Sequence, residues 1–213
     1  MEDVTVTVSD VETVGPDAIA LAFESPPGFD ARPGQFVKLG ATVEGEEYSR
    51  FYTISSPDVA GTFEVTVAVD PDGELGPHLA ALEPGDTLTL SGPYGNAYYE
   101  DEARVVVLAG GPGVGPAIGI ARRALADDNE AAIVYRDAEH IHGDALADLE
   151  TAGATVRVLD ADEALAEAVA DVVTGRPEEQ VFVYGFAGFL DDATSAIEAA
   201  GGDPDEAKVE NFG

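Results

Sequence analysis

The sequence of 213 residues is long enough for one large domain or two small ones, and its hydrophobic content of 45% is enough to form a core. It holds 42 acidic residues against ten basic ones, a formal net charge of −32, which argues against nucleic acids and anionic membranes as partners. It contains no cysteine, which excludes disulfide bonds and a cysteine-ligated iron–sulfur cluster on this chain.

The chain has no apolar run of about 18 residues that could span a membrane. Its first residues lack the basic and apolar regions of a signal peptide. We therefore predict a cytoplasmic protein. The acidic residues are spread along the whole chain, a pattern typical of halophilic proteins, because molar salt shortens the electrostatic screening length to about 3 Å. An acidic protein of a mesophile is the alternative.

Short strands separated by turn signals are predicted in the first hundred residues. Residues 4–8 alternate strictly between valine and threonine, as expected of a half-buried strand. Comparable runs cover residues 18–23, 35–39, 50–57, 62–69 and 87–90. Together with one short helix near residues 77–82, these six strands predict a small closed antiparallel β-barrel over residues 1–100.

The pattern changes after about residue 100. Residues 104–109 form a continuous apolar run, as expected of a strand buried on both faces. Further strands are predicted at residues 131–135, 154–159, 181–184 and 208–212. Helices are predicted at residues 117–126 and 144–152, after a capping box formed by Asp160 and Glu163, and in a last segment ending at Ala200. This alternation predicts right-handed βαβ units in a five-stranded, doubly wound parallel sheet over residues 101–213.

The strand at residues 50–57 carries an unusual set of side chains. Arg50 offers a planar fork of donors that suits phosphate oxygens, and Tyr52 offers a ring on which another flat ring can lie. Thr53 adds a hydroxyl that can donate to a ring nitrogen. This set suits a planar cofactor that bears a phosphate, and the alternative is a barrel strand with an ordinary surface arginine.

The segment Arg50-x-Tyr52-Thr53 resembles the Arg-x-Tyr-Ser/Thr motif of the ferredoxin–NADP reductase family. A barrel followed by a doubly wound domain is also the family's order, so the resemblance covers nearly the whole chain. It implies FAD, in preference to FMN, in the first domain and NADPH or NADH in the second. It assigns Arg50 to the flavin nucleotide's phosphate, Tyr52 to the face of the isoalloxazine and Thr53 to the neighbourhood of flavin N5. Phe51, Val67 and Val69 are further flavin-binding positions that it implies.

The resemblance continues at Gly73, Glu74, Leu75 and Gly76, where the family has a glycine-rich turn before a helix that holds the flavin's phosphates. Free amides and the helix dipole at such a position favour an anion. The family has serine or threonine where this chain has Gly76, so one hydroxyl donor is missing and backbone amides would have to serve.

A second glycine-rich turn runs from Gly110 to Pro116, between a strand and a helix that opens at Pro116. Gly110, Gly111, Pro112 and Gly113 resemble the family's Gly-Gly-Thr-Gly sequence for binding the nicotinamide dinucleotide, with Pro112 in place of the threonine and Gly115 in place of the usual alanine. A tight turn without a ligand is the alternative.

The second strand of this domain ends in Arg136 and Asp137, where the family recognises the adenosine ribose. Arg136 suits a 2′-phosphate and Asp137 a 2′-hydroxyl, so these residues leave NADPH against NADH open. For His140 and His142, in the following loop, we expect positions on the surface.

Two segments of the resemblance concern the nicotinamide. Tyr184 and Gly185 occupy the place of a family Cys-Gly pair, and the bulk of Tyr184 predicts a reshaped or blocked nicotinamide slot, next to Phe186. Glu210 and Phe212 resemble the family's terminal Glu-x-aromatic, whose ring covers one flavin face. A terminal strand whose phenylalanine merely packs is the alternative.

We therefore predict a FAD-dependent NAD(P)H oxidoreductase without a metal, which transfers hydride between nicotinamide and flavin N5 and passes electrons to ferredoxin or another small acceptor. Thr53, Glu210 and Phe212 are its expected reacting-site residues. Two alternatives stay open. One is an electron-transfer subunit of a larger complex, and the other is a flavin-binding module that no longer uses NAD(P)H.

Overall fold

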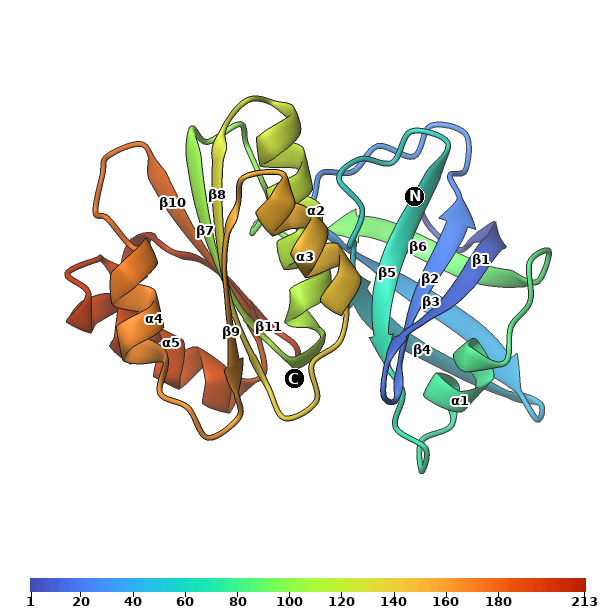
Figure 1. The fold of residues 1–213 in the computed structure, drawn as a ribbon. Coiled ribbons are helices and arrows are strands. Elements are labelled where there is room, and N and C mark those ends of the chain that lie inside the picture. Colours follow the sequence, from blue (N-terminus) through green and yellow to red (C-terminus); the bar gives the residue numbers. More distant parts are fainter.

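The computed structural model describes residues 1–213, and its N-terminal part is a six-stranded antiparallel sheet in the order β4-β3-β6-β1-β2-β5 (Figure 1). The strands are β1 (Val4–Gly15), β2 (Ala18–Glu24), β3 (Phe36–Val43), β4 (Glu46–Thr53), β5 (Thr62–Ala68) and β6 (Thr87–Tyr94). A bridge between Ile54 and Val65 joins the two edge strands, so the sheet closes into the predicted barrel. Helix α1 (Leu75–Ala80) lies between β5 and β6 in the chain.

The barrel core follows from the alternation that the sequence displays. Val6, Leu21 and Val65 are fully buried, and their neighbours in the chain include threonine, alanine and glutamate. Strand β4 begins at Glu46 and ends at Thr53, whereas the predicted strand covered residues 50–57. The reason is that Glu44 and Gly45 alone make the hairpin turn, with φ of 52° and 92°.

The C-terminal part is a five-stranded parallel sheet in the order β11-β10-β7-β8-β9. Its strands are β7 (Arg104–Gly110), β8 (Glu130–Asp137), β9 (Thr155–Asp160), β10 (Glu179–Gly185) and β11 (Lys208–Asn211). Its helices are α2 (Val114–Ala126), α3 (Gly143–Thr151), α4 (Leu165–Val172) and α5 (Ala187–Ala199). Short 3₁₀ turns occupy Gly111–Gly113 (η1) and Pro204–Glu206 (η2).

Helices cover both faces of this sheet, as predicted for a doubly wound domain. Val105 and Val107 of β7 belong to the core beneath α2 and α3, while Val106 and Leu108 belong to the core beneath α4 and α5. Figure 1 shows α2 and α3 between the sheet and the barrel, and α4 and α5 on the far side. The continuous apolar run of β7 is therefore buried on both faces.

Two helix starts differ from the predictions. Helix α4 begins at Leu165, because Asp160 and Glu163 close a turn on each other instead of capping it. The Asp160 N–H donates to Glu163 Oε2 at 2.8 Å, and the Glu163 N–H donates to the Asp160 carbonyl at 3.0 Å. Helix α2 begins at Val114, so Pro116 stands in its first turn, where a missing N–H costs no hydrogen bond.

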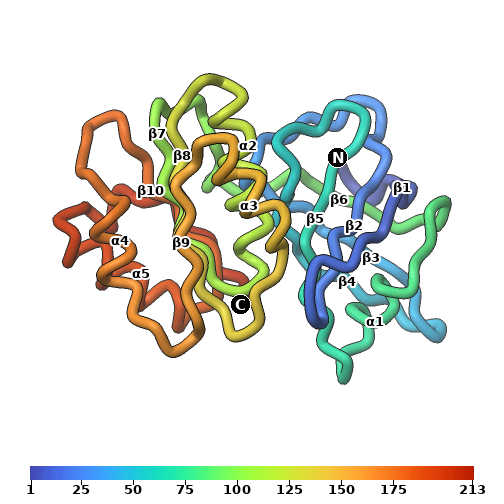
Figure 2. The backbone as a smooth tube through the Cα atoms, viewed as in Figure 1, coloured from blue at the N-terminus to red at the C-terminus, as the bar shows by residue number.

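The two halves meet along helix α2, and two of its glycines permit the close approach. A Cβ at Gly115 would lie 2.2 Å from Thr66 Oγ1, and one at Gly119 would lie 2.6 Å from the Ser55 carbonyl oxygen. Gly115 therefore has a packing reason for replacing the family's alanine. Figure 2 shows that the C-terminus lies beside this junction. No helix is both long enough and apolar enough to cross a membrane.

Candidate functional site

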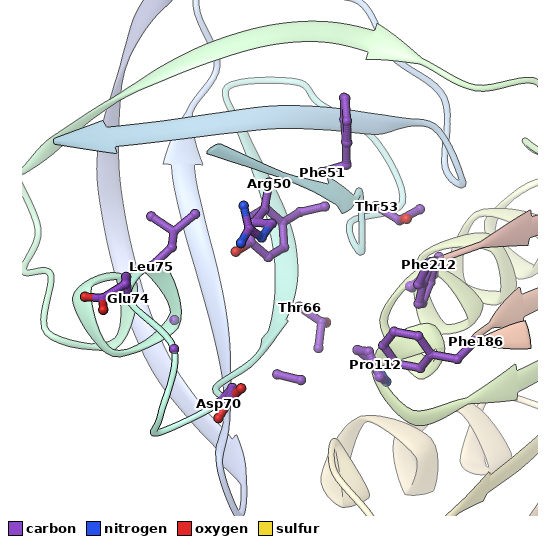
Figure 3. A pocket seen from close by; sticks show the side chains of 15 residues that line it. Arg50, Phe51, Thr53, Thr66, Asp70, Glu74, Leu75, Pro112, Phe186 and Phe212 are labelled. Atoms are coloured by element: carbon purple, nitrogen blue, oxygen red, sulfur yellow. The ribbon is translucent and has the colours of Figure 1, made fainter. Parts of the chain in front are cut away.

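A cavity of about 280 Å³ opens where the barrel faces the second domain (Figure 3). From the barrel it is lined by Arg50, Phe51, Tyr52, Thr53, Thr66, Ala68, Asp70, Gly73, Glu74, Leu75 and Gly76. From the second domain it is lined by Pro112, Pro116, Phe186 and Phe212. In Figure 3, Thr66 lies between the barrel residues and the group formed by Pro112, Phe186 and Phe212. The cavity thus combines residues from both predicted cofactor segments.

Strand β4 supplies one wall of the cavity. Arg50 is exposed and has no acidic partner, because its Nη1 donates only to the Ser49 carbonyl at 2.8 Å. Burial raises the pKa of Tyr52 to about 12, although the Arg50 charge opposes the shift. Tyr52 is therefore a neutral ring, next to a guanidinium that is free to bind an anion.

Phe51 forms the exposed rim of the same wall. Its side chain is 62% exposed, and it meets the rings of Phe36 and Tyr94 edge-on at 5.4 and 6.2 Å. A large apolar side chain this exposed beside a cavity favours a ligand or partner that covers it.

Thr53 and Glu210 join the two domains at the cavity. The Thr53 hydroxyl donates to Glu210 Oε1 at 3.0 Å, and Thr53 is buried. Glu210 is held on β11, opposite Tyr184 of β10. Burial raises the pKa of Glu210 to about 7, opposed by the Thr53 hydrogen bond. A carboxyl group with this pKa can take up or release a proton near neutral pH.

Two phenylalanine side chains form the opposite wall. The rings of Phe186 and Phe212 meet edge-on, 5.9 Å apart. The Phe212 N–H donates to the Gly185 carbonyl at 3.0 Å, which extends the β10–β11 pairing by one residue beyond Asn211. Phe212 also packs on the main core of the second domain. Its ring is therefore held by packing and one backbone bond near the chain end.

The turn that leads into α1 forms the third wall. All four residues from Gly73 to Gly76 line the cavity. Helix α1 begins at Leu75, and the first turn of a helix leaves its N–H groups without partners in the helix. Backbone donors can therefore serve this end of the cavity without the hydroxyl that Gly76 lacks.

The prediction for strand β5 is one residue out of phase. Thr66, Ala68 and Asp70 line the cavity, whereas Val67 is 1% exposed in the barrel core and Val69 packs against that core. Successive side chains of a strand point to opposite faces, so the set that faces the cavity excludes both valines. Sequence reasoning missed Thr66, although its place between Val65 and Val67 marks it as the polar member of the alternation.

The second glycine-rich turn packs closely on β10 and α5. A Cβ at Gly113 would lie 2.4 Å from the Tyr184 carbonyl oxygen, and one at Gly110 would lie 2.5 Å from the Phe189 ring. Gly111 has φ of 56°, in the left-handed region. Of the predicted dinucleotide residues in this turn, only Pro112 lines the cavity. Close packing therefore explains why these positions are glycine, whether or not a dinucleotide binds there.

Tyr184 does not line this cavity, and the expected effect of its bulk on the nicotinamide slot stays a prediction. Its side chain is wholly buried, and its hydroxyl donates to the Ala97 carbonyl, away from the cavity lining. The side chain is thereby excluded from binding a ligand. Gly185 likewise does not line the cavity. It packs against α5, where a Cβ at this position would lie 2.8 Å from the Phe189 ring.

Arg136 stands at the end of β8, but its guanidinium is occupied. Its Nη2 lies 2.6 Å from Asp192 Oδ2, and its guanidinium carbon lies 5.4 Å from the centre of the Phe189 ring. Asp137 accepts a hydrogen bond from the Tyr135 hydroxyl at 3.2 Å, and its Oδ2 would lie 3.8 Å from a Cβ at Gly111. Both residues adjoin the glycine-rich turn, since Arg136 pairs with Gly110 in the sheet, but the Arg136 guanidinium is bound to Asp192 whereas the Asp137 carboxylate lies near Gly111.

The two loop histidines differ from each other. His140 lies at the surface, as predicted, where its Nε2 lies 3.0 Å from the Leu159 carbonyl oxygen. The surface position predicted for His142 is wrong, because this residue is buried against the barrel. Its Nε2 lies 2.9 Å from Thr66 Oγ1. No local pattern could signal this contact, since the partner belongs to the other domain.

The residues around the cavity fit a flavin nucleotide. A guanidinium without an acidic partner and a helix start provide for its phosphates, and the Tyr52 ring provides for a flat ring system. The Thr53 hydroxyl donates its proton to Glu210, so it offers a lone pair to a ring N–H and not the expected donor to a ring nitrogen. Apolar side chains, among them Ala68, Leu75 and Phe212, lie between these polar groups, and the carboxylates of Asp70 and Glu74 also line the cavity.

Comparison with known proteins agrees with this fit. The family described as the oxidoreductase FAD-binding domain matches residues 5–99. NADH-cytochrome b5 reductase 1 of Laccaria bicolor is 34% identical over 118 residues, which cover 53% of this chain and 38% of that protein. A component of the 1,2-phenylacetyl-CoA epoxidase of Escherichia coli is 27% identical over a match that covers 92% of this chain and 64% of that component. The chain thus spans less than two thirds of each of these relatives.

Solved structures share the whole fold. The FAD/NAD-binding domain of nitric oxide dioxygenase from Vibrio cholerae superposes with a TM-score of 0.85 at 22% identity, covering all of both chains. A ferredoxin NADP⁺ reductase from Neisseria gonorrhoeae with bound FAD and NADP superposes with a TM-score of 0.82 at 18% identity, again over both chains. Residues 5–99 are thus similar to the oxidoreductase FAD-binding domain family, and the whole chain shares the two-domain fold of these solved structures.

Proposed function

We propose that the chain is a FAD-dependent NAD(P)H oxidoreductase, with an FAD domain at residues 1–100 and a nicotinamide-dinucleotide domain at residues 101–213. It would act in the cytoplasm and pass electrons to ferredoxin or another small acceptor. The observation that carries the proposal is the cavity between the two domains, which brings together Arg50, Tyr52 and the Thr53–Glu210 pair. FAD, when bound, supplies the hydride and electron chemistry.

The chain's own residues bind, orient and supply protons. Arg50 and the amides at the start of α1 hold phosphate oxygens, and Tyr52 supports the face of the ring system. The Thr53 hydroxyl, which lines the cavity, donates to Glu210 and holds the carboxyl group behind the cavity wall. Glu210 holds or releases a proton near pH 7. Phe186 and Phe212 exclude water from the side where the second domain closes the cavity.

We further infer that NADH is preferred to NADPH. The ion pair with Asp192 occupies Arg136, while the Asp137 carboxylate stands beside the glycine-rich turn. A carboxylate accepts a hydrogen bond from a ribose 2′-hydroxyl and repels a 2′-phosphate.

The test is an anaerobic titration of the FAD-loaded protein with NADH and NADPH, followed by flavin absorbance. We expect NADH to bleach the flavin at lower concentration than NADPH, and Asp192→Asn, which frees Arg136, to narrow the difference. A flavin that neither nucleotide reduces would contradict the enzyme proposal and favour a flavin-binding module. Equal responses to both, unchanged by Asp192→Asn, would contradict the inferred preference.

A second candidate function is a reductase subunit of a larger complex. The relative from Escherichia coli, whose match covers 92% of this chain, is described as one subunit of an epoxidase. Copurification of a stable partner, with electron transfer to that partner only, would favour this candidate.

Removing Phe212 and Gly213 should tighten binding of NADH about two- to tenfold. If nicotinamide lies against the flavin where the Phe212 ring now stands, binding must first displace this ring from its edge-on contact with Phe186. Such a contact contributes roughly 0.5–1.5 kcal/mol beyond area burial, which sets the size of the effect. NADH titration of the truncated and full-length proteins measures it.

Asn211→Ala is a suitable control for this truncation, because it alters an exposed residue at the same chain end and keeps both rings. Equal NADH affinity in the truncated and full-length proteins would show that Phe212 only packs.

A further inference from the structure

Three buried polar residues form a hydrogen-bonded chain behind the cavity. Ser55 Oγ lies 2.9 Å from Thr66 Oγ1, and Thr66 Oγ1 lies 2.9 Å from His142 Nε2. Ser55 is 1% exposed, Thr66 5% and His142 9%. Burial of polar groups is costly unless they are paired. Here Ser55 pairs with Thr66 inside the barrel, and Thr66 pairs with His142 across the junction of the domains.

This chain separates the first cavity from a second one. Thr66 lines the first cavity, the proposed flavin pocket. Ser55 and His142 line the second cavity, which measures about 380 Å³ and lies between β1, β5, α2 and α3. Thr66 is therefore the residue through which this hydrogen-bonded chain connects the two cavities.

The surroundings hold the chain in place. A Cβ at Gly115 would lie 2.2 Å from Thr66 Oγ1 and 2.5 Å from Ser55 Oγ, so the backbone of α2 packs directly on both hydroxyls. The His142 N–H donates to the Val14 carbonyl at 2.7 Å, and His142 has φ of 59°. His142 Nδ1 has no protein partner. Every fully buried side-chain nitrogen and oxygen has a partner, so Nδ1 is not fully buried and reaches the second cavity, which His142 lines.

The tautomer of His142 decides what Thr66 can offer to the first cavity. A hydroxyl has one proton and two lone pairs. When the imidazole proton is on Nε2, His142 donates to Thr66, and the Thr66 proton can point into the cavity. When the proton is on Nδ1, Nε2 accepts the Thr66 proton, and Thr66 presents only a lone pair to the cavity.

We propose that His142 and Thr66 carry protons between the second cavity and the flavin pocket, with Ser55 as the second partner that orients the Thr66 hydroxyl. One proton enters at His142 Nδ1, the Nε2 proton passes to Thr66 Oγ1, and the Thr66 proton leaves to an acceptor in the pocket. The reverse sequence returns the ring to its first tautomer. The flavin end of this route rests on the proposed function, and the route is separate from the Thr53–Glu210 pair.

The environment keeps His142 neutral, as exchange between its two tautomers requires. Burial lowers the pKa of His142 to about 4, and the Arg122 charge adds to the effect. Around this ring, charged or titratable groups come from β1, β5, α2 and α3, namely Glu12, Glu64, Arg122, Asp144 and Asp148. A neutral ring can accept at one nitrogen while it donates at the other.

The first experiment uses the apoprotein with ¹⁵N-labelled histidine. The chain has three histidines, so ring signals can be assigned with single variants. We expect the His142 nitrogens to show intermediate shifts from two exchanging neutral tautomers. Thr66→Val should move them towards one tautomer, and Thr66→Ser should restore them. A His142 ring locked in one tautomer, or one that Thr66→Val leaves unchanged, would overturn the proposal.

The second experiment measures the rate at which ferricyanide reoxidises the NADH-reduced, FAD-loaded protein in H₂O and D₂O. We expect Thr66→Val and His142→Gln to slow the phase that depends on the solvent isotope by roughly tenfold or more. The rate of this phase in Thr66→Ser should stay within about twofold of the unaltered protein, and His140→Gln should not change it. Rates and isotope ratios equal to those of the unaltered protein would refute the relay. Failure to bind FAD would refute the proposed function and leave the NMR result standing.

Discussion

Arg50→Ala is expected to weaken FAD binding by roughly ten- to a hundredfold. Arg50 is the only basic residue that lines the cavity, so no other side chain can take over a phosphate contact. It also has no acidic partner in a chain that carries 42 acidic residues, so its charge is available to an anion. Hydrogen bonds to charged groups contribute about 1.5–3 kcal/mol, which gives the expected size.

Two variants serve as controls for this prediction. His78→Ala alters helix α1 at a residue that does not line the cavity, and Lys38→Ala removes another cation, from the neighbouring strand β3. Fluorescence titration of the apoproteins with FAD in molar salt, which screens the net charge, compares all three. If Lys38→Ala weakened FAD binding as much as Arg50→Ala, Arg50 would act only through the overall electrostatic potential of the barrel and not through a direct contact.

The strands, the order of the two domains and the wall formed by β4 were predictable because they depend on local patterns. Alternating runs in the first half indicate strands that are buried on one face. The continuous apolar run of β7 indicates a strand that is buried on both faces. The alternation also marks Thr66 as the polar member of β5, but what this face of the strand contacts was not predictable in the same way. Val65 and Val67 face the barrel core, and only the closure of the barrel decides that Thr66 faces outward to the second domain.

Pairings between distant segments could not be read from the sequence. Thr66 and His142 are 76 residues apart in the chain, and Thr53 and Glu210 are 157 residues apart. The ion pair of Arg136 with Asp192 joins residues that are 56 apart in the chain. Because of this pair, the cation at the end of β8 is not free to bind a 2′-phosphate. A pattern shows which residue types are present, but such contacts decide whether a side chain is free to bind a ligand.

The partly buried carboxyl group of Glu210 makes the stability of the fold depend on pH. Burial raises its pKa from 4.5 to about 7, so the folded protein holds the proton more tightly than the unfolded chain. The favourable contribution of the protonated group is fully present below pH 4.5 and is lost as the pH rises through about 7. At about pH 8 the buried carboxylate therefore destabilises the fold, by up to roughly 3 kcal/mol.

Glu210→Gln should therefore stabilise the protein at about pH 8 and leave it nearly unchanged at about pH 4.5. Glutamine carries no charge, and its side-chain oxygen can still accept the hydrogen bond that Thr53 donates. Denaturant unfolding at both pH values in molar salt gives the free energies, and Glu198→Gln, at an exposed position of α5, is the matched control. We expect a gain of up to roughly 3 kcal/mol at the higher pH for Glu210→Gln alone. An equal gain at the lower pH, or an equal effect of Glu198→Gln, would mean that burial of the Glu210 charge is not the cause.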